Sequence, residues 1–440
     1  MKKSFTHIVT ACALLLGSQM AVSAQDGPGG NHPTFKARAF YGDKVLNRVV
    51  AIDVHKMQLA GTVDTIGSTP YPVDQAGTLD KVYAITRGTP SVDVITADTL
   101  ENVGVIPLSH KPRSGESYNA RLGLALIAGA NKPLTSVIDV VNDSVVAVAG
   151  VDVETVQTED NGGSLSSGHP AWLSKDRFVV IDRANRTINL YGIEKIQEEG
   201  LDYSWEVTHL SQVSTPTSVH HILYRDLSQL SQPEKRTFYA LFEGSANEGI
   251  RPGILKLHLD MLDELSLVRQ VSFEAKGVDA ADMSSHHADF HPDGTHIYAG
   301  STEGHLFVVD SINMEVETVI KSGLGTGHTR FVPAKDLAIV TNHHDTFVTV
   351  VDIKKHRKIK DVTVSGPKTH GQILQSHTNF VSPDSMYYYA FASDNGFFFE
   401  FDLKNLEVSR TLHTGGAPVQ GSFINWDYFS YDGDSAATGM

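Results

Sequence analysis

Residues 290–320 read FHPDGTHIYAGSTEGHLFVVDSINMEVETVI, and the fold follows from this stretch. Short apolar or alternating runs are separated by breaks at Pro, Gly, Asp and Asn, which is typical of β-strands joined by tight turns. The same order recurs from Phe380 to Leu412, where FVSPD is followed by YYYAF and then by FFFEFD. Each stretch therefore predicts one unit of four short strands.

Similar units follow one another along the chain at a period of ~40–50 residues, which is the period of four-stranded propeller blades. Seven complete units run from Tyr71 to Leu412. Residues 35–64 supply only three strands, and Pro418 to Ile424 has the pattern of the missing first strand. The sequence therefore predicts an all-β protein, a single β-propeller of eight (alternatively seven) four-stranded blades closed by an N-/C-terminal latch. Such a closure removes the exposed sheet edge.

The start of the chain has the features of a secretory signal peptide, with Lys2 and Lys3 before an apolar stretch that is too short to span a bilayer. We expect residues 1–24 to be the signal peptide, 25–34 a linker, 35–432 the β-propeller and 433–440 a C-terminal tail. The predicted location is the periplasm, without membrane insertion. Cys12 follows residues with lipobox character, but the apolar run continues past it, so a lipoprotein is not expected.

Composition narrows the possible functions. The formal charge of -15 excludes a nucleic-acid partner, because such binding depends on neutralising phosphates with Lys and Arg. The chain of 440 residues has 21 His and one Cys, and removal of residues 1–24 takes away His7 and Cys12. Without Cys, disulfides, thiolate ligands and iron–sulfur clusters are impossible. Any transition metal would then be held by His, carboxylates, Met or Tyr.

A histidine recurs at one position of the repeat. Five successive units begin their first strand with the pattern His-x-x-aromatic, at His169, His221, His287, His328 and His377. The latch strand has Gln420 at this position. In a propeller the first strand lines the central channel and begins at the same face in every blade. These side chains are therefore predicted to converge at the mouth of the channel.

Further residues extend this candidate metal site. His220 and His286 double the histidine in two units, and His344 lies in a turn between a second and a third strand. Gln420 and Arg330 are candidates for orienting a substrate. The alternative is a purely structural role, because the Gly-His pair of WD-type repeats is bonded inside its own blade. That alternative does not explain why the histidines occur only in five consecutive units, so we favour metal binding.

The units resemble the YVTN-type repeats of periplasmic propellers, through stretches such as Gly294 to Asp310. A Cys-free ring of inward histidines on such a propeller resembles nitrous oxide reductase and thiocyanate dehydrogenase, in which His from successive blades hold a multicopper cluster. The resemblance covers the architecture and the five His-x-x-aromatic positions. This chain lacks the Cys-bearing copper domain of nitrous oxide reductase, so electrons are not expected to enter by that route. A second resemblance is to the periplasmic zinc metallochaperones that are built on propellers.

Three hypotheses follow from these patterns. The first is a copper-dependent oxidoreductase that acts on a small inorganic or anionic substrate, with a periplasmic electron-transfer partner. The second is a zinc or copper metallochaperone that delivers its ion to a metal-transport partner without catalysis. The third is a scaffold propeller that binds a protein on one face. No G-x-S-x-G or H-E-x-x-H motif and no Walker-type loop points to another reaction.

Overall fold

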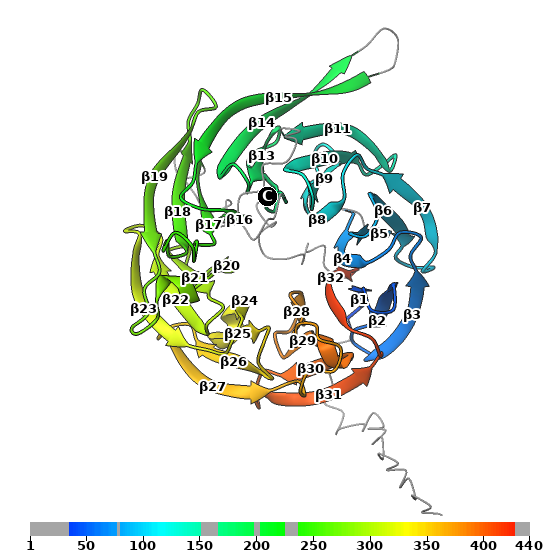
Figure 1. Ribbon diagram of the computed structural model, residues 1–440. Coiled ribbons are helices and arrows are strands. Elements are labelled where there is room, and N and C mark those ends of the chain that lie inside the picture. The colour runs from blue at the N-terminus through cyan, green and yellow to red at the C-terminus, as the bar shows by residue number, and fades with distance from the viewer. Residues whose placement is uncertain (1–34, 77–79, 151–165, 198–202, 225–235, 427–440) are drawn as a thin grey trace, which may run out of the picture.

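The computed structural model describes residues 35–76, 80–150, 166–197, 203–224 and 236–426. The expected signal peptide, linker and tail lie outside these residues, as do the last six residues of the expected propeller. The described chain forms eight four-stranded antiparallel sheets arranged as a ring, which confirms the eight-blade propeller and excludes the seven-blade alternative (Figure 1). No helix within the described ranges is long and apolar enough to cross a membrane.

The blades are numbered here from the one that contains both chain ends, and each is given from its innermost to its outermost strand. Blades 1 to 4 consist of β32 (Pro418–Asn425), β1 (Ala37–Asp43), β2 (Arg48–Asp53) and β3 (Gln58–Asp64); β4 (Pro70–Gln75), β5 (Lys81–Thr86), β6 (Ser91–Thr96) and β7 (Asn102–Pro107); β8 (Pro112–Asn119), β9 (Leu124–Gly129), β10 (Leu134–Asp139) and β11 (Ser144–Gly150); and β12 (Ala171–Trp172), β13 (Arg177–Asp182), β14 (Thr187–Gln197) and β15 (Tyr203–Ser214).

Blades 5 to 8 follow the same order. They consist of β16 (Val219–Leu223), β17 (Thr237–Phe242), β18 (Gly253–Leu259) and β19 (Leu265–Ser272); β20 (His287–Phe290), β21 (His296–Gly300), β22 (His305–Asp310) and β23 (Glu315–Lys321); β24 (Thr326–Val332), β25 (Leu337–Asn342), β26 (Phe347–Asp352) and β27 (Arg357–Thr363); and β28 (Asn379–Val381), β29 (Tyr387–Ala392), β30 (Phe397–Asp402) and β31 (Glu407–His413). Short 3₁₀ turns lie at η4 (Ala280–Asp282), η5 (Pro333–Lys335) and η6 (Ser393–Asn395).

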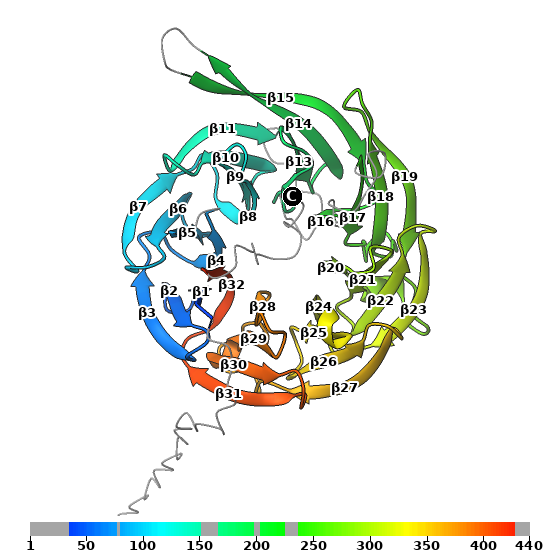
Figure 2. The ribbon, with the colours of Figure 1, turned by 180° about the vertical axis from the view of Figure 1, so that it is seen from behind.

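The hydrophobic core lies between neighbouring blades. In blade 7, Val350 of β26 packs against Tyr388 and Phe399 of blade 8, and similar clusters join other pairs of blades. The two middle strands of a blade are buried on both faces, as in β10, whereas the outermost strand, as in β27, is mostly exposed. A blade cannot cover both of its own faces, so the sheets stack radially around the ring (Figure 2).

The latch predicted from the two chain ends is confirmed. Strand β32 is the innermost strand of blade 1 and pairs antiparallel with β1 from Ala37↔Asn425 to Asp43↔Pro418. The hydroxyl of Tyr41 in β1 also donates a 2.6 Å hydrogen bond to the carbonyl of Thr378 in blade 8. The C-terminal strand therefore completes the sheet begun by the N-terminal strands and closes the ring.

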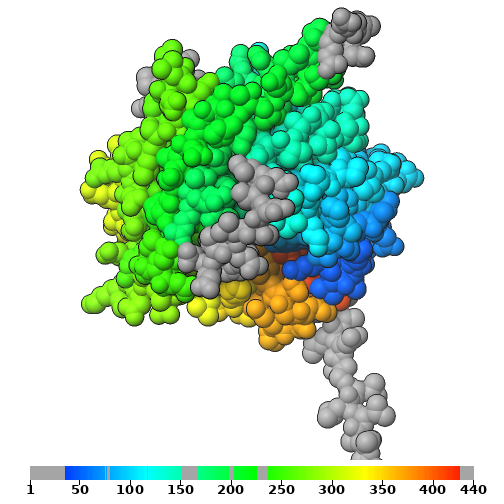
Figure 3. Space-filling view, turned by 45° about the horizontal axis from the view of Figure 1, so that its top comes forward, coloured from blue at the N-terminus to red at the C-terminus, as the bar shows by residue number. Residues whose placement is uncertain are grey.

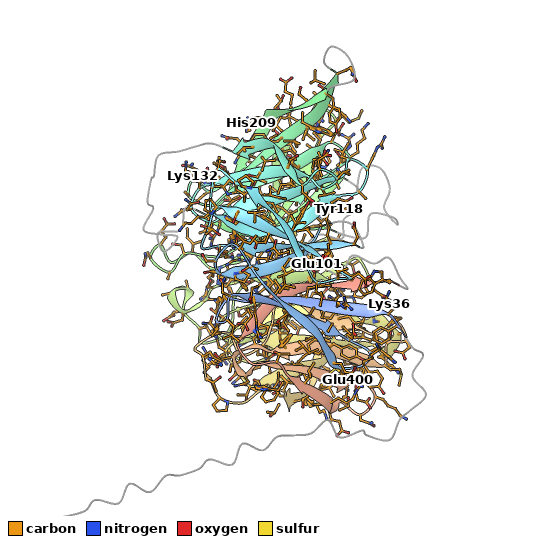
Figure 4. The ribbon with its side chains drawn as sticks, turned by 90° about the vertical axis from the view of Figure 1, so that its right-hand side faces the viewer. Lys36, Glu101, Tyr118, Lys132, His209 and Glu400 are labelled. Carbon is orange, nitrogen blue, oxygen red and sulfur yellow. The ribbon has the colours of Figure 1, made fainter. Side chains whose placement is uncertain are left out.

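The antiparallel order of the strands defines two faces of the ring. Each innermost strand begins at one face, where the turns between the second and third strands also lie. In the edge-on view, Lys132 in the β9–β10 turn marks this face, and Lys36, just before β1, marks the opposite face (Figure 4). In the space-filling view, the blades follow one another around the ring and pack closely against their neighbours (Figure 3).

We expect the close pairing of β32 with β1 to require glycine at position 421. A Cβ added to Gly421 would lie 1.7 Å from the carbonyl oxygen of Phe40. Gly421→Ala should therefore lower the free energy of unfolding by about 2 kcal/mol or more, because the latch strand must move away from its partner. Denaturant unfolding measures the loss. The control is Gly104→Ala in β7, where an added Cβ meets nothing within 4 Å. Equal stability of the two variants would contradict this account of the latch.

Candidate metal centre

The innermost strands of all eight blades contribute to a single cavity of about 300 Å³. The five His-x-x-aromatic histidines belong to blades 4 to 8. Three of them lie among the first three residues of the innermost strand of their blade, and the other two lie two residues before it. The other three blades supply Gln420, Tyr71 and Arg113. The residues contributed in this way are Gln420, Tyr71, Arg113, His169, His221, His287, His328 and His377. The structure therefore brings the five predicted histidines and Gln420 together around one cavity, together with Tyr71 and Arg113, which the sequence analysis did not predict.

A second set of cavity residues comes from one position of the repeat that the His-x-x-aromatic pattern does not mark. This position is the residue directly after the second strand of a blade. It holds Arg87 after β5, Arg183 after β13, Glu243 after β17 and His343 after β25, and all four line the cavity. The turn at the end of the second strand opens on the same face as the start of the first strand, so both positions face one space. The recurrence of this position in the repeat is the signal that could have identified them.

A local irregularity explains why two consecutive histidines reach the cavity from blade 5. In a regular strand, neighbouring side chains point to opposite faces. The pairing of β16 with β17 shifts register between Val219 and His221, which is a β-bulge at His220. Both His220 and His221 consequently line the cavity. In blade 6, His286 lies just before β20 and reaches the same space as His287.

One group of histidines is centred on His287. Its ring centroid lies 3.9 Å from that of His328, 5.0 Å from that of His377 and 5.3 Å from that of His343. The rings of His343 and His377 are 4.3 Å apart. One nitrogen from each of His287, His343 and His377 lies within 4.8 Å of the other two, which is close enough for a shared metal ion. These residues come from blades 6, 7 and 8.

The ring of His343 is oriented with a free nitrogen in this group. Its Nδ1–H donates a 2.9 Å hydrogen bond to the Gln375 carbonyl, which leaves Nε2 as the nitrogen with a lone pair. Nε2 is buried and makes no hydrogen bond within the described part of the chain. A Cβ on Gly327 would lie 2.2 Å from this nitrogen, so only glycine allows the ring to sit here. A buried lone pair without a donor is unfavourable unless a cation or another donor occupies the space.

A second group of histidines surrounds Glu243. Its Oε1 accepts hydrogen bonds from Nδ1 of His220 at 2.8 Å and from Nδ1 of His286 at 3.2 Å. Arg183 donates to the other carboxylate oxygen. The ring of His220 lies 4.9 Å from that of His169 and 5.6 Å from that of His287. The two histidine groups are therefore adjacent and meet at His287.

Burial keeps several imidazoles of the cavity neutral. Burial lowers the pKa of His221 to about 4 and that of His343 to about 3. Burial and then the neighbouring rings hold the pKa values of His287 and His377 well below their usual range. Although burial opposes ionisation of Glu243, Arg183 and the bonds from His220 and His286 hold its pKa well below the usual range. Neutral imidazole is the form that binds metal ions.

The side of the cavity formed by blades 2 and 3 is cationic. The guanidinium of Arg87 lies 4.1 Å from the ring centre of Tyr71 and donates to the Arg113 carbonyl at 2.8 Å. Arg113 donates to the carbonyl of Ser167 at 2.5 Å. The Tyr71 hydroxyl lies 3.4 Å from His377 Nδ1, which joins this side to the first histidine group. With Arg183, three arginines face one glutamate among the described residues that line the cavity.

Of the remaining predicted residues, two line the cavity and one does not. Gln420 and His344 line the cavity. Arg330 does not, because its guanidinium bonds the side chain and carbonyl of Asn379 in blade 8 at 2.6 and 3.0 Å. Arg330 lies two residues beyond His328 along β24, so its side chain starts about 7 Å deeper in the ring. It holds two blades together at that level.

Comparisons with known proteins show the fold. No family model matches the chain, and no curated protein matches its sequence. Among solved structures, the dihydro-heme d1 dehydrogenase NirN has a TM-score of 0.61 at 13% identity over 90% of this chain and 76% of that chain. Apo AztD from Citrobacter koseri has a TM-score of 0.54 at 13% identity over 89% of this chain and 99% of that chain. A protein from Lactobacillus plantarum has a TM-score of 0.53 at 14% identity over 75% and 97% of the two chains. At these identities the likeness supports a β-propeller and no particular activity.

The lowered pKa values predict how stability depends on pH. The unfolded chain protonates its histidines near pH 6.5, whereas folded His221 and His343 do so only near pH 4 and 3. The unfolded state therefore binds more protons within this window, so the stability of chelator-treated protein should fall as the pH is lowered below about 6.5. The loss is on the order of 1.4 kcal/mol per pKa unit for each histidine. Denaturant unfolding at several pH values measures it.

A variant and a control make this measurement specific. His343→Asn should weaken the pH dependence, because one histidine with a lowered pKa has been removed. His413→Asn replaces an exposed histidine of β31 outside the cavity and should keep the slope of the parent protein. The explanation fails when the metal-free parent is equally stable at pH 5 and pH 7.

Proposed function

We propose that this protein is a periplasmic copper-dependent oxidoreductase that acts on a small inorganic or anionic substrate. The observation that carries the proposal is the crowding of nine histidines on one cavity that also has three arginines. The histidines are His169, His220, His221, His286, His287, His328, His343, His344 and His377. One tetrahedral ion uses at most four ligands, so this number suits a centre with more than one metal ion.

The donor set fits copper. The lone pair at His343 Nε2 and the close group formed with His287 and His377 offer neutral imidazoles, which suit copper, zinc, nickel and iron. In the group around Glu243, the carboxylate holds Nδ1 of His220 and of His286 and so directs their other nitrogens. Bound copper would supply one-electron redox chemistry at this position. The described residues position it, keep its ligands neutral and shape the space beside it.

The arginines suggest the class of substrate. Arg87 contacts both Tyr71 and Arg113, and the hydroxyl of Tyr71 reaches His377 of the first histidine group. A guanidinium offers several fixed donors to an anion, whereas it repels a metal cation. A site used only to carry a cation would gain nothing from them. An anion held by Arg87 and Arg113, with Gln420 at the rim, would lie next to the first histidine group.

One observation favours a second candidate function, zinc delivery without catalysis. His220, Glu243 and His286 form a His₂Glu group whose ligand atoms lie within 4.8 Å of one another. Two His and one Glu are a common ligand set for zinc with an open fourth position. On this alternative the partner would be a metal-transport protein, and on the copper hypothesis it would be a periplasmic electron-transfer protein.

Metal analysis of protein purified from the periplasm tests the choice. Two or more copper ions per chain, with a copper signal in electron paramagnetic resonance, are expected for the oxidoreductase. A cavity that holds one exchangeable zinc ion and no copper would overturn it in favour of delivery, and a cavity without metal would leave only a scaffold. His343→Asn should lower the copper content, whereas the control His413→Asn should not.

A second measurement tests the anion site. Azide is a small anion that binds copper, and its binding to the copper-loaded protein can be followed in the visible spectrum. Arg113→Gln should weaken azide binding by about tenfold while the copper content stays unchanged, since about 1.4 kcal/mol of anion binding is lost. An unchanged azide affinity would show that the arginines do not serve an anionic ligand.

A further inference from the structure

A separate group of metal-binding side chains lies on the opposite face of the ring. Strand β20 runs from His287 at the cavity to Phe290, and His291 follows its end. His296 begins β21, and Glu317 lies near the start of β23 in the same blade. His356 comes from the turn between β26 and β27 of blade 7. His291 and His296 lie at the end of the first strand and the start of the second, and His356 and Glu317 lie in a turn before the fourth strand and near the start of a fourth strand. In an antiparallel blade all of these positions are on the face that Lys36 marks in Figure 4.

The distances in this group suit one metal ion. Nε2 of His296 lies 3.0 Å from Oε2 of Glu317, and the rings of His296 and His356 are 4.7 Å apart. One ligand atom from each of these three residues lies within 4.8 Å of the other two. Two ligands about 2.0 Å from a tetrahedral zinc ion lie about 3.3 Å apart, so His296 and Glu317 need to separate only slightly to admit the ion.

Neighbouring groups orient both histidines for this role. Asp293 accepts a 2.6 Å hydrogen bond from Nδ1 of His296, which directs Nε2 towards Glu317. The Tyr298 hydroxyl lies 2.7 Å from Nδ1 of His356 and fixes that ring through the nitrogen that is not needed for a metal. A hydrogen-bond partner on the far nitrogen of a metal-binding histidine, often a carboxylate, is the usual arrangement in zinc sites.

His291 also helps to hold the residues of this group in place. Its Nε2–H donates to the Ile353 carbonyl at 3.2 Å, so Nδ1 has the lone pair. This nitrogen accepts the backbone N–H of Asp293 at 3.1 Å and lies 2.9 Å from the carboxylate oxygen of that residue. His291 thereby fixes the Asp293 loop, and Asp293 in turn holds His296. The side chains of Asp293 and Glu317 are 35% and 45% exposed, so an ion from solvent can reach the site.

We propose that His296, Glu317 and His356 form a second metal site, which takes a divalent transition-metal ion of the zinc type. Asp293 and Tyr298 are its positioning residues. The ligands belong to two blades, so the ion ties blade 6 to blade 7 on the face away from the cavity. The site shares no residue with the cavity and stands whether or not the cavity holds copper.

Zinc binding by the full-length, chelator-treated protein tests the proposal. A crystal soaked in zinc chloride and measured at the zinc absorption edge should show an anomalous peak between His296, Glu317 and His356. In equilibrium dialysis, His356→Ala should lose this one equivalent or bind it at least about 100-fold more weakly. Tyr298→Phe should weaken it about tenfold, because His356 keeps its nitrogen but loses its positioning bond.

Control measurements separate this site from the cavity. Zinc should raise the melting temperature of the parent protein more than that of His356→Ala, since the bound ion joins two blades. His343→Asn changes only the cavity and should keep the anomalous peak at the second site, whatever metal the cavity takes. Absence of that peak in the parent crystal would overturn the proposal, as would an unchanged zinc stoichiometry and affinity in His356→Ala.

Discussion

A four-stranded blade is apolar on both faces, and the structure depends on how these faces are covered. Each blade packs its faces against its two neighbours, so no blade is complete until the ring is closed. The chain meets this requirement by pairing β32 with β1, which gives the first blade its fourth strand and joins the two ends of the ring. The closed ring in turn brings the starts of eight innermost strands around one axis. The cavity is therefore a consequence of packing the blades against one another, and the side chains that line it determine its chemistry.

Repetition made most of the fold and half of the site predictable from the sequence. The start of each first strand could be aligned by its His-x-x-aromatic pattern. The five histidines of this pattern accordingly line one cavity in the structure. The latch could be predicted because a blade with three strands requires a fourth. In each case the prediction used the position of a residue within the repeating unit, which can be determined from a single sequence.

Other features were marked by no recurring residue type, or depend on how the ring closes. Arg87, Arg183, Glu243 and His343 share a position in the repeat but not a residue type, so no motif marked them. Arg330 was expected to orient a substrate, yet its place two residues beyond His328 along the strand puts it at another level, where it bonds Asn379. The group at His296 and His356 joins turns of two blades about sixty residues apart, and only the closed ring shows that they meet.

The order of the blades also makes the cavity asymmetric. Blades 2 and 3 supply Tyr71, Arg87 and Arg113, whereas blades 6 to 8 supply His287, His343 and His377, which burial keeps neutral. Arginines and candidate metal ligands therefore share one space, where Arg113 Nη2 lies 3.4 Å from Nδ1 of His220 and Arg183 binds Glu243. An anion beside the arginines would also reduce the repulsion between them and metal cations at the histidines. Binding of metal and binding of anion at this cavity should therefore support each other, which is the arrangement expected of a site where an anionic substrate meets a metal centre.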